Sequence, residues 1–202
     1  MSKEIEIEFK SMLTKTEYEH LLRFYRVTDN QFVTQTNLYF DTVDFQLKQH
    51  GMGLRIRRFS DRAEATLKVP QPIGLLEVTD PLSLSEVDNA MESEQFTPEA
   101  NEISDWLKDL KIRLQDVHLI GKLVTKRAEF MIPEGKLALD ESWYSDQHDF
   151  ELELEVPNST FEELDFKQLL KRHDLPYRHT QNKIVRAVTA LQEQHKEMEG
   201  LQ

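Results

Sequence analysis

Residues 4–10 read Glu-Ile-Glu-Ile-Glu-Phe-Lys, and this stretch decides the fold. Charged and apolar residues alternate along it without a break, which predicts a β-strand because successive side chains of a strand point to opposite faces. One face carries Ile5, Ile7 and Phe9, and the other carries three glutamates and Lys10. Glutamates two residues apart on one face repel each other. The stretch therefore predicts a counter-charge or a metal ion opposite this strand.

The composition limits the classes of function. The chain has 202 residues, 39% of them hydrophobic, which is enough to bury the core of one domain spanning residues 1–202. Its net charge of -12 argues against a general nucleic-acid surface, which needs a basic stripe. The absence of cysteine excludes disulfides, thiolate metal sites and a cysteine nucleophile. The N-terminus is charged at once and no apolar run reaches the length of a membrane span, so we expect a cytoplasmic protein without a membrane partner.

The same alternation recurs along the chain and predicts about eight strands, separated by short turns that favour antiparallel pairing. The expected strands cover residues 4–10, 33–40, 54–57, 63–69, 73–79, 117–132, 137–143 and 150–156. Apolar residues at helical spacing predict helices over residues 14–27, 83–91, 98–110, 160–172 and 181–195. Thr14 begins an expected capping box, and Thr97 is the expected N-cap of the third helix. We expect a turn region over residues 44–53, a turn or bulge at Gly121 and a hairpin turn at residues 133–135.

The sign of the charge is sorted by strand. Acidic residues alternate with apolar ones in residues 4–8 and again in residues 151–155, whereas Arg55, Arg57 and Lys68 lie on other strands. A solvated sheet face with chance alternation is one interpretation. If the sheet instead closes into a barrel, the charged faces point inward together and the apolar faces point outward beneath the helices. We therefore expect an α+β fold, a closed or nearly closed antiparallel eight-stranded β-barrel with a charged lumen, covered outside by helices.

Such a lumen suits a complex of a metal ion and a polyphosphate. Hard cations such as Mg²⁺ and Mn²⁺ take carboxylate oxygens, while arginine and lysine neutralise phosphate oxygens. The chain has no GxxxxGK[ST] loop, no nucleophile-elbow serine motif and no histidines at metal-ligand spacing. Phosphates would therefore be held by side chains rather than by a glycine-rich loop.

An ordered series of motifs resembles one known family. Residues 6–10, Glu-Ile-Glu-Phe-Lys, are similar to the N-terminal ExExK motif of the CYTH superfamily, also called triphosphate tunnel metalloenzymes. The rest of the series follows in the family's order over nearly the whole chain: Tyr39-Phe-Asp-Thr42, Leu54-Arg-Ile-Arg57, Lys68, Arg127, Asp140, Glu153-x-Glu155 and Lys183. The resemblance implies a tunnel that binds a triphosphate together with a divalent cation.

The resemblance also implies a role for each of these charged residues. It implies that one or two Mg²⁺ or Mn²⁺ ions are held by Glu6, Glu8, Glu153 and Glu155, with Asp140 assisting. It implies that the triphosphate is bound by Lys10, Arg55, Arg57, Lys68, Arg127 and Lys183. Of all these residues, the expected catalytic ones are Glu6, Glu8 and Lys10.

Three assignments stay open at this point. Glu151 shares a face with the later glutamates of its strand and could replace one of them. Lys126 and Arg127 face opposite ways in a regular strand, so one of the two should enter the lumen. Residues 77–80 offer at most one inward carboxylate.

The predicted function is that of a metal-dependent triphosphatase. Water would attack the terminal phosphoryl group of inorganic triphosphate or of a nucleoside triphosphate. The alternatives are a class IV-type adenylate cyclase that makes cyclic AMP from ATP, a non-catalytic polyphosphate- or nucleotide-binding module, and a structural interaction domain. Trp143 and Tyr144 could stack on a base or a thiamine ring, although a position at the rim or in the core is the favoured interpretation. The expected partner is a small-molecule triphosphate, with no nucleic acid, and both a monomer and a homodimer are compatible with the sequence.

Overall fold

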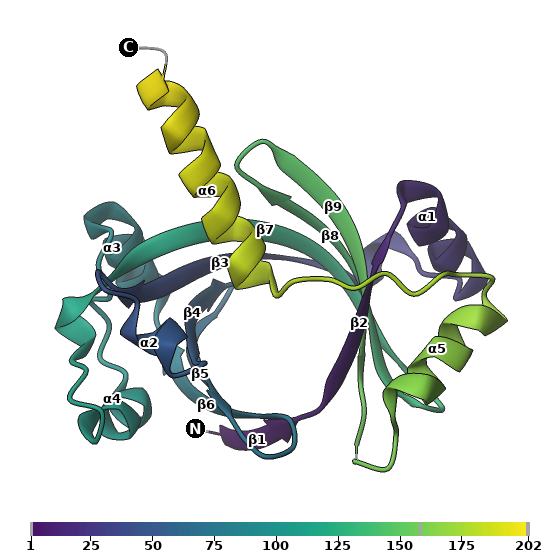
Figure 1. Cartoon of the computed structure of the whole chain (residues 1–202), viewed down its shortest axis with the longest axis horizontal. Coiled ribbons are helices and arrows are strands. Elements are labelled where there is room, and N and C mark those ends of the chain that lie inside the picture. Colours follow the sequence, from purple (N-terminus) through teal and green to yellow (C-terminus); the bar gives the residue numbers. More distant parts are fainter. Residues whose placement is uncertain (1, 158, 201–202) are drawn as a thin grey trace.

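A single antiparallel sheet curls into a nearly closed barrel in the computed structural model, which describes residues 2–157 and 159–200 (Figure 1). Its strands are β1 (Ser2–Glu6), β2 (Glu8–Leu13), β3 (Phe32–Thr42), β4 (Gly53–Arg58), β5 (Ala63–Pro70), β6 (Leu75–Leu82), β7 (Val117–Ile132), β8 (Gly135–Tyr144) and β9 (Gln147–Glu155). They follow the order β1-β6-β5-β4-β3-β7-β8-β9-β2. The predicted α+β barrel is confirmed, with the difference that nine strands rather than eight form it within the described part of the chain.

The ninth strand arises from a break in the stretch that opened the sequence analysis. Its first half, β1, pairs with β6, and its second half, β2, pairs with β9. Ile7 lies at the change of partner, where its carbonyl oxygen accepts a hydrogen bond from the backbone N–H of Val156 at 2.9 Å. β1 and β2, which follow each other in the chain, therefore lie at the two ends of the sheet. Because β1 and β2 end the strand order and do not pair with each other, the barrel is nearly rather than fully closed.

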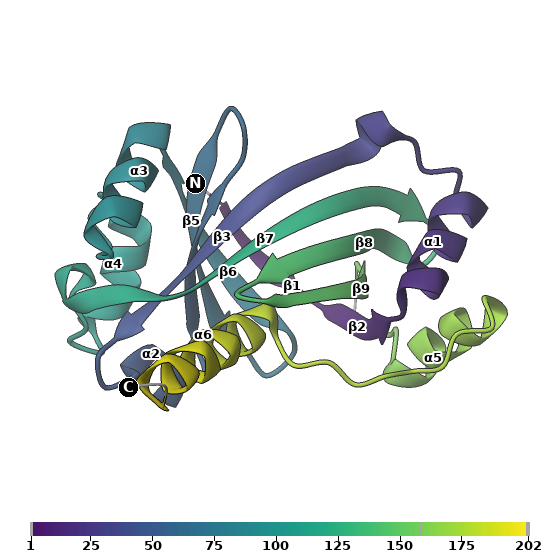
Figure 2. The ribbon, with the colours of Figure 1, turned by 90° about the horizontal axis from the view of Figure 1, so that it is seen from above.

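Helices pack against the outside of the sheet at its two sides (Figure 2). The described helices are α1 (Lys15–Phe24), α2 (Gln46–Gln49), α3 (Leu84–Ser93), α4 (Asn101–Lys108), α5 (Glu163–Arg172) and α6 (Lys183–Gly200). Figure 2 shows α3 and α4 at one side of the sheet and α1 and α5 at the other, while α2 and α6 lie apart from both groups. Among these described helices, none is long and apolar enough to cross a membrane.

Two hydrophobic cores lie between the outer face of the sheet and these helices. In the first, Leu54 and Ile56 of β4 are fully buried in one cluster with Val87 of α3 and Ile103 of α4. The second joins the outward residues of β8 and β9 to apolar side chains of α1 and α5: Leu137, Leu139, Leu152, Leu154, Tyr18, Leu21, Phe166 and Leu169. Burial of such side chains supplies most of the free energy that favours folding. The expected inside-out arrangement, with apolar faces outward, is confirmed.

Several local predictions are also confirmed. Thr14 and Glu17 form the capping box of α1, and β7 covers the predicted residues 117–132. The register between β3 and β7 shifts next to Gly121, because Ile120 has no Cα partner on β3. A Cβ atom on Gly121 would approach α6 to 3.3–3.4 Å, so the absence of a side chain lets α6 pack closely on β7.

The predicted start of one helix, with Thr97 as its N-cap, and the prediction of a turn without a helix at residues 44–53 were wrong, and in both places a carboxylate from a strand supplies a cap. The helix expected from residue 98 begins at Asn101, and the Asp80 side chain accepts hydrogen bonds from the backbone N–H groups of Glu102 and Ile103. The turn region over residues 44–53 contains α2, whose N–H groups donate to Asp41. The residues just before each helix did not indicate these caps, because the capping carboxylates lie on strands, Asp41 on β3 and Asp80 on β6.

Replacing Asp41 with alanine is expected to lower the free energy of unfolding by about 3 kcal/mol. The buried carboxylate accepts three backbone hydrogen bonds, from Thr42 at 2.8 Å, Leu47 at 2.9 Å and Lys48 at 3.1 Å, and the substitution leaves these donors without it. Urea denaturation would measure the change. The control is Asp44→Ala in the same loop, where the side chain is exposed and the loss should stay below about 1 kcal/mol. Equal losses in the two variants would contradict this role of Asp41.

Candidate active site

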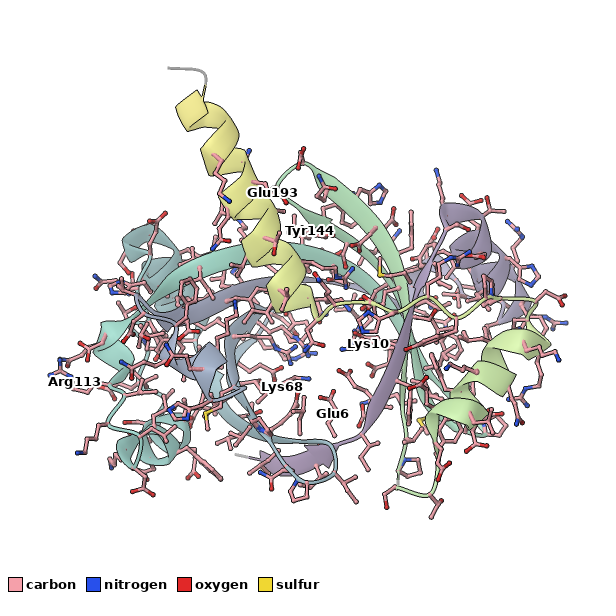
Figure 3. All side chains as sticks on the ribbon, in the orientation of Figure 1. Glu6, Lys10, Lys68, Arg113, Tyr144 and Glu193 are labelled. Atoms are coloured by element: carbon pink, nitrogen blue, oxygen red, sulfur yellow. The ribbon has the colours of Figure 1, made fainter. Side chains whose placement is uncertain are left out.

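A cavity inside the barrel collects most of the charged residues singled out in the sequence. Of those residues, the cavity is lined by Glu6, Glu8, Lys10, Arg55, Arg57, Lys68, Arg127, Glu153 and Lys183. Figure 3 shows Glu6, Lys10 and Lys68 projecting into the space that the strands enclose. The structure therefore brings together residues that lie up to 177 positions apart along the chain, from Glu6 to Lys183.

The register of the strands explains why these side chains share the inner face. Arg57 of β4 lies opposite Glu64 of β5, and Lys68 of β5 lies opposite Glu77 of β6. Directly opposed residues of an antiparallel pair project to the same side of the sheet, so each cation meets a carboxylate of the next strand. Asn37 of β3 also faces Arg57 and completes the row on that side.

One part of the lumen is acidic. Lys68 Nζ forms ion pairs with the carboxylates of Glu6 and of Glu77, the latter at 2.9 Å, and Lys10 Nζ lies 2.7 Å from Glu8. Burial, followed by repulsion from Glu8, raises the pKa of Glu6 above its usual value in spite of Lys68. Lys68 is thus shared between two carboxylates, those of Glu6 and Glu77.

Glycine allows the chain to approach this acidic region closely. Gly74, in the turn between β5 and β6, has a φ of +72°, and a Cβ atom there would lie 2.3 Å from the carbonyl oxygen of Glu6. Any other residue would have to displace the Glu6 backbone and would also strain its own. Gly74 therefore lets the β5–β6 hairpin pack closely against the backbone of Glu6.

The adjoining part of the lumen, on β4, is basic and loosely paired. The guanidinium of Arg55 lies 3.7 Å from Glu77, and that of Arg57 lies 3.6 Å from Glu64. Arg57 Nε also donates to Asn37 Oδ1 at 3.3 Å. Burial, then the neighbouring charges of Arg55 and Arg127, lower the pKa of Arg57 to about 10. Arg57 is still protonated at neutral pH, and its charge would be stabilised by an anion in the cavity.

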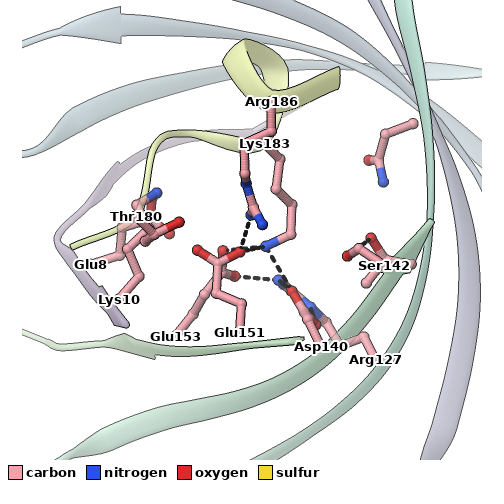
Figure 4. A network of polar contacts seen from close by, with 12 residues as sticks. Glu8, Lys10, Arg127, Asp140, Ser142, Glu151, Glu153, Thr180, Lys183 and Arg186 are labelled. Atoms are coloured by element: carbon pink, nitrogen blue, oxygen red, sulfur yellow. Dashed lines mark hydrogen bonds and ion pairs between the residues drawn. The ribbon is translucent and has the colours of Figure 1, made fainter. Parts of the chain in front are cut away.

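A tight network of charges lies at the wall formed by β7, β8, β9 and the first turn of α6 (Figure 4). Lys183 Nζ lies 2.8 Å from Asp140, 2.7 Å from Glu151 and 2.6 Å from Glu153. Arg127 binds Asp140 through two nitrogen atoms, at 2.7 and 2.6 Å, and also pairs with Glu153. Burial opposes ionisation of Glu153, but Lys183 and Arg127 outweigh it and hold the pKa of Glu153 well below its usual range.

The structure answers the three open assignments. Glu151 enters the network, and carboxylate oxygens of Asp140, Glu151 and Glu153 lie within 4.8 Å of one another. Among the described residues, Asp140, Glu151 and Glu155 are all absent from the cavity lining, but Glu151 pairs with Lys183 of the network at 2.7 Å, whereas Glu155 pairs with Lys136 at 2.5 Å near the end of β9. The geometry thus places Glu151, rather than Glu155, beside Glu153.

The other two open assignments concern β7 and β6. Arg127 enters the lumen, whereas Lys126 lies over the ring of Phe32, with Nζ 4.3 Å from its centroid. Glu77 is the inward carboxylate of its strand, and Asp80 caps α4 instead. In both cases the alternation of side chains along a strand separates the two candidates.

Sequence reasoning missed several residues of the lumen. The cavity is also lined by three alternate residues of β3: Gln35, Asn37 and Tyr39. The alternation was therefore present in the sequence, but these side chains carry no charge that would have drawn attention to it. Arg186, which is not among the described residues lining the cavity, was also missed; it lies three residues after Lys183 on α6 and pairs with Glu151. The spacing of three on a helix would have placed it on the same face as Lys183.

The two aromatic residues at the end of β8 do not line the cavity in the described structure. Trp143 stacks on His148, with ring centroids 5.1 Å apart, and is partly exposed. Tyr144 Oη donates to Asp149 at 2.5 Å and packs in a small cluster with Leu123 and Ala187. Their surroundings match the rim or core interpretation rather than a stacking platform in the lumen.

The donor set of the lumen fits a hard divalent cation. Carboxylate oxygens are the ligands that Mg²⁺ and Mn²⁺ prefer, and the raised pKa of Glu6 indicates negative charge that a cation would relieve. Asp140, Glu151 and Glu153, whose carboxylate oxygens lie within 4.8 Å of one another, are of the same chemical type and are paired with Lys183, as Glu6 and Glu8 are paired with Lys68 and Lys10. Both groups of carboxylates therefore offer oxygen ligands to a divalent cation.

Comparison with known proteins agrees with this architecture. A relative from Bacillus subtilis (strain 168), "Putative triphosphatase YjbK", is 39% identical over 186 residues, which cover 92% of this chain and 95% of the relative. A solved structure described as a putative adenylate cyclase from Bacillus halodurans is 40% identical with a TM-score of 0.81, covering 92% of this chain and 98% of that one.

A third solved structure shares the fold at lower identity. It is HpAC1 from Hippeastrum, described as a putative adenylyl cyclase with a dominant triphosphatase activity, and it is 20% identical with a TM-score of 0.72 over 90% of this chain and 94% of that one. The family model of the CYTH domain matches residues 4–188. With this match over nearly the whole chain and a charged lumen inside the barrel, the protein belongs to the CYTH domain family.

Proposed function

We propose that this protein is a divalent-metal-dependent triphosphatase that cleaves the terminal phosphoryl group of inorganic triphosphate or of a nucleoside triphosphate. The observation that carries the proposal is the loosely paired Arg55 and Arg57 inside an otherwise acidic protein, since their ion pairs of 3.7 and 3.6 Å leave positive charge for a phosphate chain. The name of the Bacillus subtilis relative and the activity described for the Hippeastrum protein support the same reaction class.

The basic residues of the lumen would bind the substrate. Their arrangement around one cavity suits an extended polyanion, whose oxygens could be met from several strands at once. The binding set in this proposal is Lys10, Arg55, Arg57, Lys68, Arg127 and Lys183. By holding the phosphates in one orientation, these side chains would align the terminal phosphorus with an attacking water and stabilise charge on the leaving oxygens.

The acidic residues would hold the cation and orient the water. Glu6 and Glu8 are the principal proposed ligands, and Glu153 and Asp140 complete the proposed set; Glu155, expected from the sequence as a further ligand, pairs with Lys136 instead. When bound, a divalent cation would neutralise phosphate oxygens and favour ionisation of a water. A carboxylate of Glu6 or Glu8 would accept a hydrogen bond from the attacking water. Lys10, 2.7 Å from Glu8, would then donate to the phosphoryl group as charge develops on it.

The test is phosphate release by purified protein from tripolyphosphate, ATP and thiamine triphosphate, each with Mg²⁺ or Mn²⁺, alongside detection of cyclic AMP. Fast release from tripolyphosphate with little from ATP would identify an inorganic triphosphatase. Production of cyclic AMP and pyrophosphate would instead support the cyclase alternative, which the description of the Bacillus halodurans neighbour brings into view. Binding without turnover would leave a non-catalytic triphosphate-binding module.

Removal of divalent cations with EDTA is expected to abolish phosphate release, and added Mg²⁺ or Mn²⁺ to restore it. Without a cation, the carboxylates of Glu6 and Glu8 repel the phosphate oxygens that they face. A thermal shift assay gives an independent readout, because a ligand at 100 times its Kd stabilises the folded state by about 2.7 kcal/mol. For a chain of this size that corresponds to an increase in Tm of about 5–10 °C with tripolyphosphate and Mg²⁺ together. Full turnover in EDTA would contradict the metal requirement.

Two broader predictions accompany this proposal. We infer that residues 1–202 act as one domain, because the lumen draws its lining from both ends of the chain. A cytoplasmic location is favoured by the absence of cysteine and stays a prediction.

A further inference from the structure

Helix α6 carries two cations, one turn apart, that meet on one carboxylate. Lys183 and Arg186 both pair with the same oxygen, Oε2, of Glu151. Lys183 lines the cavity, whereas Arg186 is not among the described residues lining it. Figure 4 shows both side chains descending from α6 toward Glu151. Arg186 therefore contacts the network of the proposed triphosphate site without lining the cavity, through Glu151, which it shares with Lys183.

Arg186 is fixed in this position by a second carboxylate. Its Nη1 lies 2.5 Å from Asp149 Oδ2, and the same oxygen accepts a hydrogen bond from Tyr144 Oη at 2.5 Å. The guanidinium carbon also lies 6.0 Å from the centre of the Tyr144 ring. Both carboxylates that bind Arg186 lie on β9, two residues apart on the inner face. Arg186 thus fastens α6 to β9 through two ion pairs in a largely buried setting.

The charges show what this fastening does for Lys183. Three carboxylates, those of Asp140, Glu151 and Glu153, lie within 2.8 Å of Lys183 Nζ. Glu153 and Asp140 share the charge of Arg127, and Glu151 shares the charge of Arg186. If Arg186 were absent, Lys183 would be the one cation of this network left to neutralise the Glu151 carboxylate. Its ammonium group would then be drawn toward Glu151 and have less charge to offer to a phosphate.

We infer that Arg186 is a positioning residue, which binds Glu151 and Asp149 and thereby holds Lys183 at the tunnel wall with charge available for the triphosphate; this inference rests on the proposed function. Arg186 itself makes no contact with the substrate in this account. Its effect should therefore appear in the affinity for triphosphate rather than in the rate of the chemical step.

Replacing Arg186 with glutamine is expected to raise the KM for tripolyphosphate about tenfold and to change kcat by less than about threefold. The Kd for tripolyphosphate in EDTA, measured by isothermal titration, should rise by a similar factor. Arg186→Lys keeps the charge but loses the planar fork that bridges Glu151 and Asp149, so its KM and Kd should lie between those of the unsubstituted protein and those of Arg186→Gln. The control is Arg172→Gln at the end of α5, which removes a surface ion pair with Glu134 of the β7–β8 turn and should leave both constants unchanged.

A second substitution separates positioning from a general structural role. The double variant Arg186→Gln/Glu151→Gln removes the cation together with the carboxylate that would capture Lys183, so its KM and Kd should return toward those of the unsubstituted protein. If Arg186→Gln lowers Tm but leaves KM and Kd unchanged, or if the double variant binds no better than the single one, the inference is overturned. Should Arg186→Gln not fold, Glu151→Gln alone is measured, and it should bind tripolyphosphate more tightly; weaker binding would overturn the inference.

The same measurements separate this inference from the proposed function. Binding of tripolyphosphate without turnover by the unsubstituted protein would overturn the proposed hydrolysis, while the Kd values of the variants would still test Arg186. Absence of both binding and turnover would overturn both.

Discussion

Replacing Arg57 with alanine is expected to lower kcat/KM for tripolyphosphate hydrolysis by about 100- to 1000-fold, the loss typical of removing one charged donor that stabilises a transition state. The guanidinium lies inside the lumen, where its ion pair with Glu64 is 3.6 Å long. Burial lowers its pKa to about 10, followed by the effect of Arg55 and Arg127. A bound phosphate group would stabilise the charged form of Arg57 and so offset the cost of burying it. This stabilisation would increase as negative charge develops on the phosphoryl group being transferred.

The adjacent Arg58 provides a matched control. It lies on the same strand, but its side chain points to the outer face, where Nε is 3.6 Å from Asp88 of α3. Arg58→Ala removes the same charge one residue away, so effects of net charge or strand stability should be common to both variants. Steady-state kinetics with Mg²⁺ would measure the difference. Equal losses for the two variants, or none for Arg57→Ala, would contradict binding of the substrate in the lumen.

Replacing Glu6 with glutamine is expected to raise the concentration of Mg²⁺ needed for half-maximal activity by about 10- to 100-fold. Glutamine keeps the shape of the side chain but removes the charge that would attract the cation. The pKa of Glu6 is raised in the folded protein, first by burial and then by Glu8. Its ionised form at neutral pH therefore opposes folding, because a group whose pKa is higher in the folded state stabilises that state at low pH and loses this effect as the pH rises.

This sign leads to a second readout for the same variant. Without metal, the Tm of Glu6→Gln should not fall, since the substitution removes a repulsion, and Lys68 keeps its partner Glu77 at 2.9 Å. The control is Glu4→Gln, an exposed position two residues earlier on β1, where metal dependence should be unchanged. An unchanged Mg²⁺ requirement in Glu6→Gln would remove Glu6 from the proposed ligand set. A large fall in Tm would contradict the electrostatic argument.

Strand positions and the direction of each face were predictable because they depend on local alternation. The pattern of residues 54–57 placed Arg55 and Arg57 on one face and Leu54 on the other, and these positions were found inside the lumen and in the outer core. The pairing register of a strand is fixed wherever one of its faces is apolar and buried, since a shift of one residue would expose every apolar side chain. The resemblance to the CYTH family is itself confirmed by the domain match over residues 4–188.

The strand break and the helix caps were not predictable in this way. Ile7 continues the alternation without interruption, yet the strand changes partner there because β6 and β9 lie at different ends of the sheet. Likewise, the caps of α2 and α4 come from Asp41 and Asp80, which belong to strands. These features depend on contacts between elements, and no local pattern reports which element will lie beside a given residue.

The sequence by itself determined that this chain forms a barrel with its charges inside, because both the alternation and the sorting of charge by strand are properties of short segments. Only the tertiary structure decided how those charges combine. It placed Glu151 with Lys183 and Arg186, and it left Glu155 with Lys136. The physical reason is that an ion pair requires two side chains within about 4 Å. That distance is set by the register of β8 against β9 and by the docking of α6 on β7, contacts between segments that are far apart in the chain.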